Sequence, residues 1–253
     1  MRIGVRAAAV AVALAGAVTG LRPEPAPAVS WTIDLESGAV WSGYNDVRIP
    51  PETGTEFSLS EDLRIDPEAF LRVRLGCELR PRHYLSLLVA PLELSAAGFR
   101  SSPTVFEGVE FPADTPLAGT YRFDSYRLTY RYDLSVGDRF KAGVGFTGKI
   151  RDAEIRLEGG GRTSAKTNTG FVPLIHFLLQ WRPGGGMTLL LEGDALAAPQ
   201  GRAEDVFLGG AYVLGPHVRL RAGYRFLEGG ADVEEVYNFA WLHYASAGVT
   251  VSF

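Results

Sequence analysis

Hydrophobic and polar residues alternate along most of the chain from residue 30 onward, in segments of ten or so residues. Because successive side chains of a β-strand point to opposite faces, a period of two predicts strands with one apolar and one polar face. In the segment 139–150, Phe140 and Phe146 fall on one face, and Lys141 and Lys149 fall on the other. Ten such segments are predicted, at 30–41, 70–79, 84–94, 120–132, 139–150, 171–181, 187–196, 206–214, 217–227 and 239–253.

The connections between these segments alternate between short turns and long polar loops. Short turns rich in Gly and Pro, such as 183–186, alternate along the chain with loops as long as 95–119. Barrels of the outer-membrane type combine short periplasmic turns with longer extracellular loops, and their strands cross the bilayer in about 9–11 tilted residues. The pattern therefore predicts an all-β fold, a transmembrane antiparallel up-and-down β-barrel of about ten strands. A further hairpin within 57–63 would make the number twelve.

A soluble β-sandwich would show the same alternation, with its apolar face turned inward. The N-terminus favours export, because two arginines precede the short apolar run 7–18 and prolines follow it. Residues 1–28 are therefore predicted to be a signal peptide, with its cleavage site left open, and residues 29–253 to be the outer-membrane β-barrel. Aromatic residues near strand ends, such as Trp31 and Trp181, fit the two interfacial girdles of a membrane barrel.

Composition narrows the set of partners and cofactors. A net charge of −4 gives no sign of a surface for nucleic acid. Cys77 is the only cysteine, which excludes an intramolecular disulfide framework. The four histidines are scattered over separate segments, without the spacing of a metal site. We therefore expect neither a nucleic acid partner nor a metal or other cofactor.

The chain ends in AGVTVSF, with Phe253 as the last residue and apolar residues at alternating positions before it. This ending resembles the C-terminal assembly signal of Gram-negative outer-membrane β-barrel proteins. The resemblance implies a location in the bacterial outer membrane and contact with outer-membrane lipids and lipopolysaccharide. It also implies recognition by the barrel-assembly machinery during biogenesis. It implies no particular activity, and it leaves the oligomeric state open.

The polar faces of the predicted strands carry more basic than acidic side chains. About ten strands lies near the barrel size that side chains fill, so buried charges there must be paired. Two interpretations follow: a salt-bridge network that plugs the lumen, or a narrow pore that prefers anions. The residues expected in this lumen network are Arg72, Arg74, Glu78, Arg127, Arg131, Lys149, Arg151, Glu192, Asp194, Arg219, Arg221 and Arg225.

Two charged stretches with glycines, 148–157 and 223–240, run from predicted strands into the long loops. Their position predicts a binding surface at the outer mouth of the barrel. The residues expected there are Arg151, Arg225, Glu228 and Asp232. Together with the lumen, these features favour a small porin-like pore, or a structural or ligand-binding protein of the cell envelope.

An enzyme acting on lipid A, phospholipid or peptide at the outer rim is the alternative. Outer-membrane lipid A deacylases and phospholipases use a histidine close to a serine, in a motif resembling His-x-Ser followed by Asn. His243 and Ser246 lie three apart without that Asn, and an odd separation puts them on opposite faces of a strand. Paired carboxylates such as Asp152 and Glu154 resemble the rim of omptin-type proteases, but no matching Asp–His pair accompanies them. We therefore assign no catalytic residue.

Overall fold

The structure is a computed structural model that describes residues 29–253, so the predicted signal peptide lies outside the described residues. No helix in this part of the chain is long and apolar enough to cross a membrane. The strands are β1 (Ser30–Arg48), β2 (Phe57–Ser58), β3 (Leu63–Ile65), β4 (Glu68–Arg80), β5 (His83–Ala90), β6 (Glu93–Phe99), β7 (Thr104–Phe106), β8 (Val109–Phe111), β9 (Pro116–Val136), β10 (Phe140–Gly159), β11 (Arg162–Gly184), β12 (Met187–Ala198), β13 (Gly201–Val213), β14 (Val218–Val233) and β15 (Val236–Ser252).

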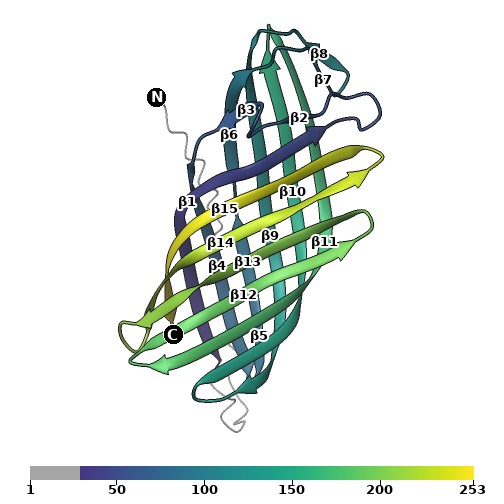
Figure 1. Cartoon of the computed structure of the whole chain (residues 1–253). Coiled ribbons are helices and arrows are strands. Elements are labelled where there is room, and N and C mark those ends of the chain that lie inside the picture. The colour runs from purple at the N-terminus through teal and green to yellow at the C-terminus, as the bar shows by residue number, and fades with distance from the viewer. Residues whose placement is uncertain (1–28) are drawn as a thin grey trace, which may run out of the picture.

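Ten antiparallel wall strands close into a barrel (Figure 1). Around the ring, β1 pairs with β4, which is followed by β5 and β6, then β9 to β15 in chain order, and β15 returns to β1. β5 and β6 lie end to end along β9 and together make one wall strand. The short strands β2, β3, β7 and β8 belong to the long connections, which define the outer end of the barrel. The predicted ten-stranded barrel is confirmed, and the segment 57–63 adds no wall strand.

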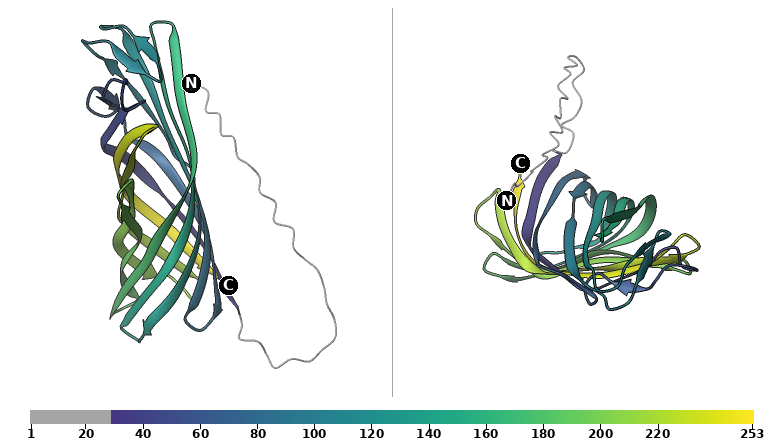
Figure 2. Two further views of the ribbon diagram at one scale, coloured as in Figure 1. Left: turned by 90° about the vertical axis from the view of Figure 1, so that its right-hand side faces the viewer. Right: turned by 90° about the horizontal axis from the view of Figure 1, so that it is seen from above.

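Several strands are longer than the sequence pattern predicts. β11 has 23 residues, against eleven in the predicted segment 171–181. The added residues of β9, β10 and β11 form a tall sheet that rises at the outer end of the barrel (Figure 2). The pattern identifies only the part of each strand whose apolar face is turned to lipid. Beyond that part both faces meet water or protein, so strict alternation is not required.

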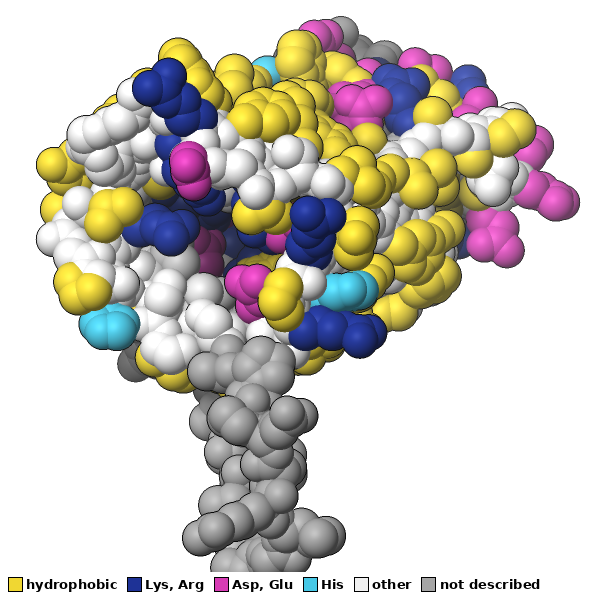
Figure 3. Space-filling view, turned by 90° about the horizontal axis from the view of Figure 1, so that it is seen from below, with side chains coloured by type: hydrophobic (Ala, Val, Ile, Leu, Met, Phe, Trp, Pro, Cys, Tyr) yellow, Lys and Arg dark blue, Asp and Glu magenta, His cyan; other side chains and the backbone are white. Residues whose placement is uncertain are grey.

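The outside of the barrel carries a belt of exposed apolar side chains. On β9, Leu128 is 50% exposed while its neighbour Arg127 is 4% exposed inside the lumen. The belt includes Ile33, Leu35, Leu71, Leu87, Val89, Leu128, Val144, Phe146, Phe171, Ile175, Leu189, Leu208 and Leu220. Seen from the end opposite the long loops, charged side chains lie inside the mouth and hydrophobic ones gather outside it (Figure 3). This inside-out arrangement excludes the soluble sandwich.

The outer half of the barrel interior is apolar rather than charged. Leu94 and Leu157 of the wall pack in one buried cluster with Ile49, Leu59 and Phe106 of the long connections, and all five are fully buried. The sequence analysis assigned the interior to charged residues along the whole strand length. It did not anticipate that the connections would place their own apolar side chains in the barrel mouth. The network of buried ion pairs therefore lies in the other half of the lumen.

Candidate functional site

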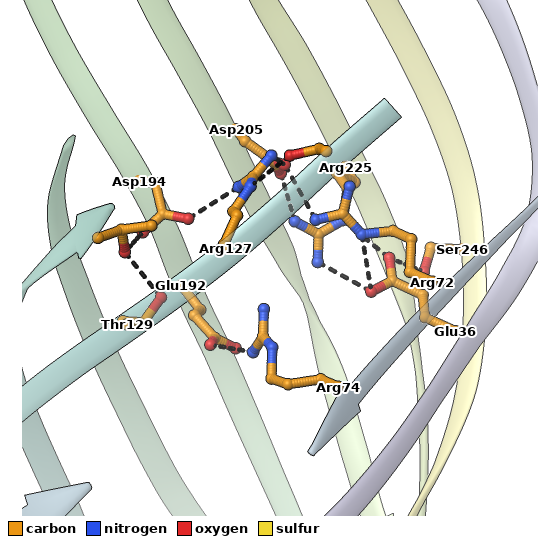
Figure 4. Close-up of polar contacts among 12 residues, drawn as sticks. Glu36, Arg72, Arg74, Arg127, Thr129, Glu192, Asp194, Asp205, Arg225 and Ser246 are labelled. Atoms are coloured by element: carbon orange, nitrogen blue, oxygen red, sulfur yellow. Dashed lines mark hydrogen bonds and ion pairs between the residues drawn. The ribbon is translucent and has the colours of Figure 1, made fainter. Parts of the chain in front are cut away.

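Five arginines and five carboxylates meet in the half of the lumen away from the long loops. We call this set the charged plug. It consists of Asp34, Glu36, Arg72, Arg74, Arg127, Glu192, Asp194, Asp205, Arg221 and Arg225. Figure 4 shows the contacts of Arg72, Arg74, Arg127 and Arg225 with Glu36, Glu192, Asp194 and Asp205. Eight of the ten are at most 8% exposed. The numbers of positive and negative side chains are equal, so the plug has no excess of arginine.

Asp205 lies at the centre of the plug and contacts three arginines. Its Oδ2 lies 2.9 Å from Arg72 Nη2 and 2.5 Å from Arg127 Nη2, and its Oδ1 lies 2.5 Å from Arg225 Nη1. Charge-assisted hydrogen bonds of this kind are about twice as strong as neutral ones. The sequence analysis missed Asp205, because the predicted strand began at 206 whereas β13 begins at Gly201. The earlier start gives residue 205 an inward position.

Glu36 is the second centre of the plug. Its two carboxylate oxygens accept hydrogen bonds from Arg225 Nε at 2.8 Å and Arg225 Nη2 at 3.0 Å. Arg221 also pairs with Glu36, and Ser246 Oγ donates a hydrogen bond of 2.7 Å to it. Arg225 was expected in both the lumen network and the outer-mouth surface, and the structure places it in the plug. Both partners of the Glu36–Arg225 pair are 2% exposed.

A polar chain continues the plug across the lumen. Asp194 accepts hydrogen bonds from Arg127 Nη1 at 2.8 Å and from Thr147 Oγ1 at 2.7 Å. His176 Nδ1 lies 2.9 Å from Asp194 Oδ1, the oxygen that also accepts the hydrogen bond from Thr147. Thr147 in turn lies 2.8 Å from Thr129, hydroxyl to hydroxyl. Each polar side chain of this series is therefore hydrogen-bonded, as is usual for buried polar groups.

Phe207 lies flat against the plug. Its ring centroid is 5.1 Å from the guanidinium carbon of Arg221 and 5.4 Å from that of Arg225. Gly209 and Gly223 on adjacent strands leave the space that the ring occupies. A Cβ atom at either glycine would come within 2.9 Å of the Phe207 Cζ atom. Packing of the Phe207 ring therefore explains why glycine occupies both positions.

Five of the residues expected in the lumen network lie outside the plug, and one of them, Arg151, lines the cavity described below. Glu78 and Arg219 are exposed at the ends of their strands, away from the long loops, and neither forms an ion pair within residues 29–253. At a strand end the side chain reaches solvent, even where the alternation assigns it to the inward face. Arg131 is buried in a separate pair, with its Nε 2.8 Å from Asp133 Oδ1. Lys149 lies on the outer side of the plug.

A cavity of about 300 Å³ lies in the outer half of the barrel, beside the apolar cluster. We call it the outer cavity. It lies between β9, β10 and β11 on one side and the tips of the β12–β13 and β14–β15 hairpins on the other. Tyr121, Phe123, Leu174 and Leu227 give it apolar walls, and Asp205 of the plug contributes to its lining. Its volume is at the lower end of the range for small-molecule sites.

The outer cavity receives two of the four residues expected at the outer mouth. Arg151 and Glu228 line it. Arg225 belongs to the plug, and Asp232 is exposed near the tip of the β14–β15 hairpin and does not line the cavity. The predicted four-residue surface is therefore not assembled. Arg225, Glu228 and Asp232 follow one another along β14, so they lie at different depths of the barrel, and Glu228 points to the opposite face from Arg225.

Glu228 anchors a polar cluster on the outer face of the wall, beyond the apolar belt. Arg202 Nε donates a hydrogen bond of 2.8 Å to Glu228 Oε2, and the Tyr44 hydroxyl donates another to the same carboxylate. A bulge between Ser42 and Tyr44 turns Tyr44 outward. Burial and the hydrogen bond to Glu228 raise the pKa of Tyr44 to about 12. Burial works to raise the pKa of Glu228, but the hydrogen bonds from Arg202 and Tyr44 outweigh it and lower that pKa.

The residues that suggested an enzyme point away from each other. Ser246 is buried in the lumen, whereas His243 faces outward, with Nδ1 2.5 Å from the Tyr224 hydroxyl and its ring stacked on Trp41 at 5.5 Å. Asp152 and Glu154 lie on the outer wall and pair with Arg122. Within residues 29–253, no three or more His, Cys, Asp or Glu side chains are grouped so as to hold a metal ion.

No family model matches the sequence, and no curated protein is similar to it. Among solved structures, the outer-membrane protease OmpT from Escherichia coli superimposes with a TM-score of 0.55 and 10% identity, over 88% of this chain and 97% of that chain. The translocator domain of the autotransporter NalP from Neisseria meningitidis gives a TM-score of 0.43 and 11% identity, over 88% of each chain. The attachment invasion locus protein Ail of Yersinia pestis, bound to sucrose octasulfate, gives 0.40 and 8%, over 88% of this chain and 99% of that chain.

At these identities the likeness to OmpT shows the fold alone, which is that of the bacterial outer-membrane β-barrel. The apolar belt and the inward charges are what this fold requires in a bilayer. The outer-membrane location predicted from the sequence agrees with both observations.

Proposed function

We propose that this protein is a closed outer-membrane barrel that binds a ligand in its outer cavity and does not conduct ions. The charged plug is the observation that carries the proposal. Its arginines and carboxylates are equal in number and bonded to each other, and Asp205 and Glu36 are 2% exposed. An ion crossing the lumen would have to separate these pairs, and each buried charge left without a partner costs several kcal/mol. The anion-preferring pore rested on an excess of basic side chains in the lumen, but each arginine of the plug is paired with a carboxylate and none is left free to attract an anion there.

The outer cavity supports the second half of the proposal. It joins apolar walls to a few polar groups, the combination that small-molecule sites use for affinity and orientation. It lies toward the end with the long loops, so a ligand has access to it without crossing the plug. The enzyme alternative draws no support from His243 and Ser246, since a base and a nucleophile must lie within hydrogen-bond reach of each other.

Reconstitution in planar lipid bilayers tests whether the barrel is closed. The purified protein is expected to give no stepwise conductance at neutral pH, while an open porin inserted in the same way serves as the control. Arg72, Arg127 and Arg225 replaced together by alanine would leave Asp205 and Glu36 short of partners and enlarge the lumen, and conductance that prefers cations is then expected. Stepwise anion conductance from the unmodified protein would refute the proposal in favour of the pore.

A further inference from the structure

The wall of the barrel opens beside the outer cavity, between β11 and β12. The two strands pair from Gly184 opposite Met187 as far as Ile175 opposite Ala195. Beyond that pair β12 continues to Ala198, and β11 continues over its outer half, but no pairing joins them within residues 29–253. On its other side β11 stays paired with β10 along its whole outer half. The gap therefore lies where the β11–β12 ladder ends, while β11 and β12 each stay paired with the strand on their other side.

Pro173 accounts for the position of this gap. It lies opposite Gly148 inside the unbroken β10–β11 ladder. Since proline has no N–H, it fits such a ladder only where its nitrogen points away from the partner strand. The nitrogen of Pro173 therefore faces β12, two residues beyond the last β11–β12 pair at Ile175. Pairing cannot continue at that point because the donor is missing.

The outer cavity extends through the gap to the outside of the barrel. Side chains of β11 alternate in direction, with Leu174 buried in the interior while Phe171 is 62% exposed on the outer face, yet both line the same cavity. Leu196 of β12 lines it from the opposite edge and is 37% exposed. Phe171 and Ile175 belong to the apolar belt, so the gap opens where the wall meets lipid. Its edges are themselves apolar.

In the outer cavity, two cations of β10 lack acidic partners. Lys149 is 3% exposed and lines the cavity, and it forms no ion pair or side-chain hydrogen bond within residues 29–253. Its Nζ lies 4.5 Å from the ring centroid of Phe123. Arg151, two residues further along the same inward face, hydrogen-bonds the neutral side chain of Asn168, and its Nε has no partner.

The acids around the cavity do not compensate these charges. Asp205, Glu154 and Glu228 are engaged with arginines. Glu204 neighbours the inward Asp205 on β13 and therefore points outward, and Glu235 is exposed in the β14–β15 turn. A buried lysine without a counter-charge is costly, and proteins otherwise pair such groups. The site is therefore electrostatically incomplete in a way that a bound anion would correct.

We propose that the outer cavity takes a single-chain anionic amphiphile through the gap between β11 and β12. Its carboxylate or phosphate binds Lys149 and Arg151, and its apolar chain lies in the gap against Phe171 and Leu196. This inference rests on the proposed ligand-binding function and names the class of ligand. The charge of the head matches the two unpaired cations, and the apolar edges of the gap match the chain. The volume of the cavity admits one chain rather than a multi-chain lipid.

Binding to the purified barrel in neutral detergent tests the proposal. The probes are dodecanoate, dodecyl phosphate, dodecanol with the same chain and no charge, and inorganic phosphate with no chain. The variant is Lys149→Met, which removes the charge and keeps a similar volume. The matched control is Lys141→Met on the same inward face of β10, because Lys141 pairs with Asp133 away from the cavity. Asp133 keeps Arg131 as a partner in that control.

The proposal expects both dodecyl anions to bind, and each to bind the Lys141→Met protein as tightly as the unmodified protein. Lys149→Met should weaken both at least about tenfold, as expected for loss of a buried charge-assisted contact. Dodecanol and inorganic phosphate should bind at least about tenfold more weakly than the dodecyl anions, since each lacks one half of the recognition. Binding of one anion alone would identify its headgroup as the source.

Three results would overturn it. Equal binding by the Lys149→Met protein would show that Lys149 does not contact the anionic head of the ligand. Equal binding of dodecanol would show an apolar site without charge recognition, and equal binding of inorganic phosphate would show an anion site without a chain; both leave a ligand-binding barrel in place. Stepwise conductance, by contrast, would refute the proposed function itself, so the two failures are distinguishable.

Discussion

Arg225 and Glu36 lie 189 positions apart in the sequence and form a two-point ion pair in the middle of the barrel, with nitrogen–oxygen distances of 2.8 and 3.0 Å. The pair joins β14 to β1 over the inward face of β15, which lies between them in the wall. Because both side chains are 2% exposed, the pair is held by the whole barrel rather than by either strand. A single substitution in this pair is therefore expected to lower the stability of the plug more than a substitution elsewhere in it.

Arg225→Met is expected to destabilise the protein by about 3–5 kcal/mol, because it leaves Glu36 and Asp205 with fewer partners in a buried site. Urea unfolding of the detergent-solubilised protein, followed by tryptophan fluorescence, measures the change. Arg64→Met is the control: its pair with Asp66 is exposed, so a change below about 1 kcal/mol is expected. Equal effects of the two substitutions would mean that the plug contributes no more than a surface pair.

Lys149→Met is expected to act in the opposite direction in the absence of ligand. Replacing a buried charge that has no partner by an apolar side chain of similar size should stabilise the barrel by about 1–2 kcal/mol. The same unfolding titration measures it. Lys141→Met should instead lower the stability, because Lys141 Nζ lies 2.6 Å from Asp133 Oδ2. A loss of stability in Lys149→Met would indicate that this lysine has a structural partner and is not free to bind a ligand.

Pro173→Val is expected to close the gap between β11 and β12. Valine supplies the missing N–H toward β12, so the ladder can continue beyond Ile175. Hydrogen–deuterium exchange of amides in the segment 195–198 should slow, and dodecanoate binding should weaken. Pro183→Val, at the exposed opposite end of the same strand, should change neither measurement. Unchanged exchange in the first variant would show that another feature keeps the strands apart.

The contribution of Glu228 to stability is expected to depend on pH. Its pKa is lower in the folded barrel than the value of 4.5 for a free glutamate, so its contribution is present above pH 4.5 and is lost as the pH falls through the folded pKa. Arg202 is half-exposed, which limits the contribution to less than about 1 kcal/mol. Thermal unfolding should therefore separate the unmodified protein from Glu228→Gln at pH 7, and the difference should shrink as the pH falls below 4.5. A difference that grows on acidification would contradict this assignment.

Some features of the site follow from residue order alone. The inward Ser246 and outward His243 follow from counting along one strand, and so do the inward Arg72, Arg127 and Arg221. The partners of these residues do not follow from counting. Arg225 was expected to serve the lumen and the outer mouth at once, and the depth of its strand in the barrel decided between them. Asp205 was not expected in the lumen, because a strand end cannot be located from alternation once the strand leaves the lipid.

The sequence by itself predicted the class of this protein. The alternation of side chains along a strand is a local property that survives in any register, and the N-terminal export signal, the alternating loop lengths and the aromatic residues at strand ends favoured a membrane barrel over a soluble sandwich. The sequence therefore predicted apolar residues outside the barrel and charges inside it. Only the tertiary structure decided what the interior does, since the tilt and stagger of ten strands select which charges meet. The balance of the charged plug, the apolar filling of the outer half by loop residues, and the isolation of Lys149 beside a gap in the wall are all consequences of that packing.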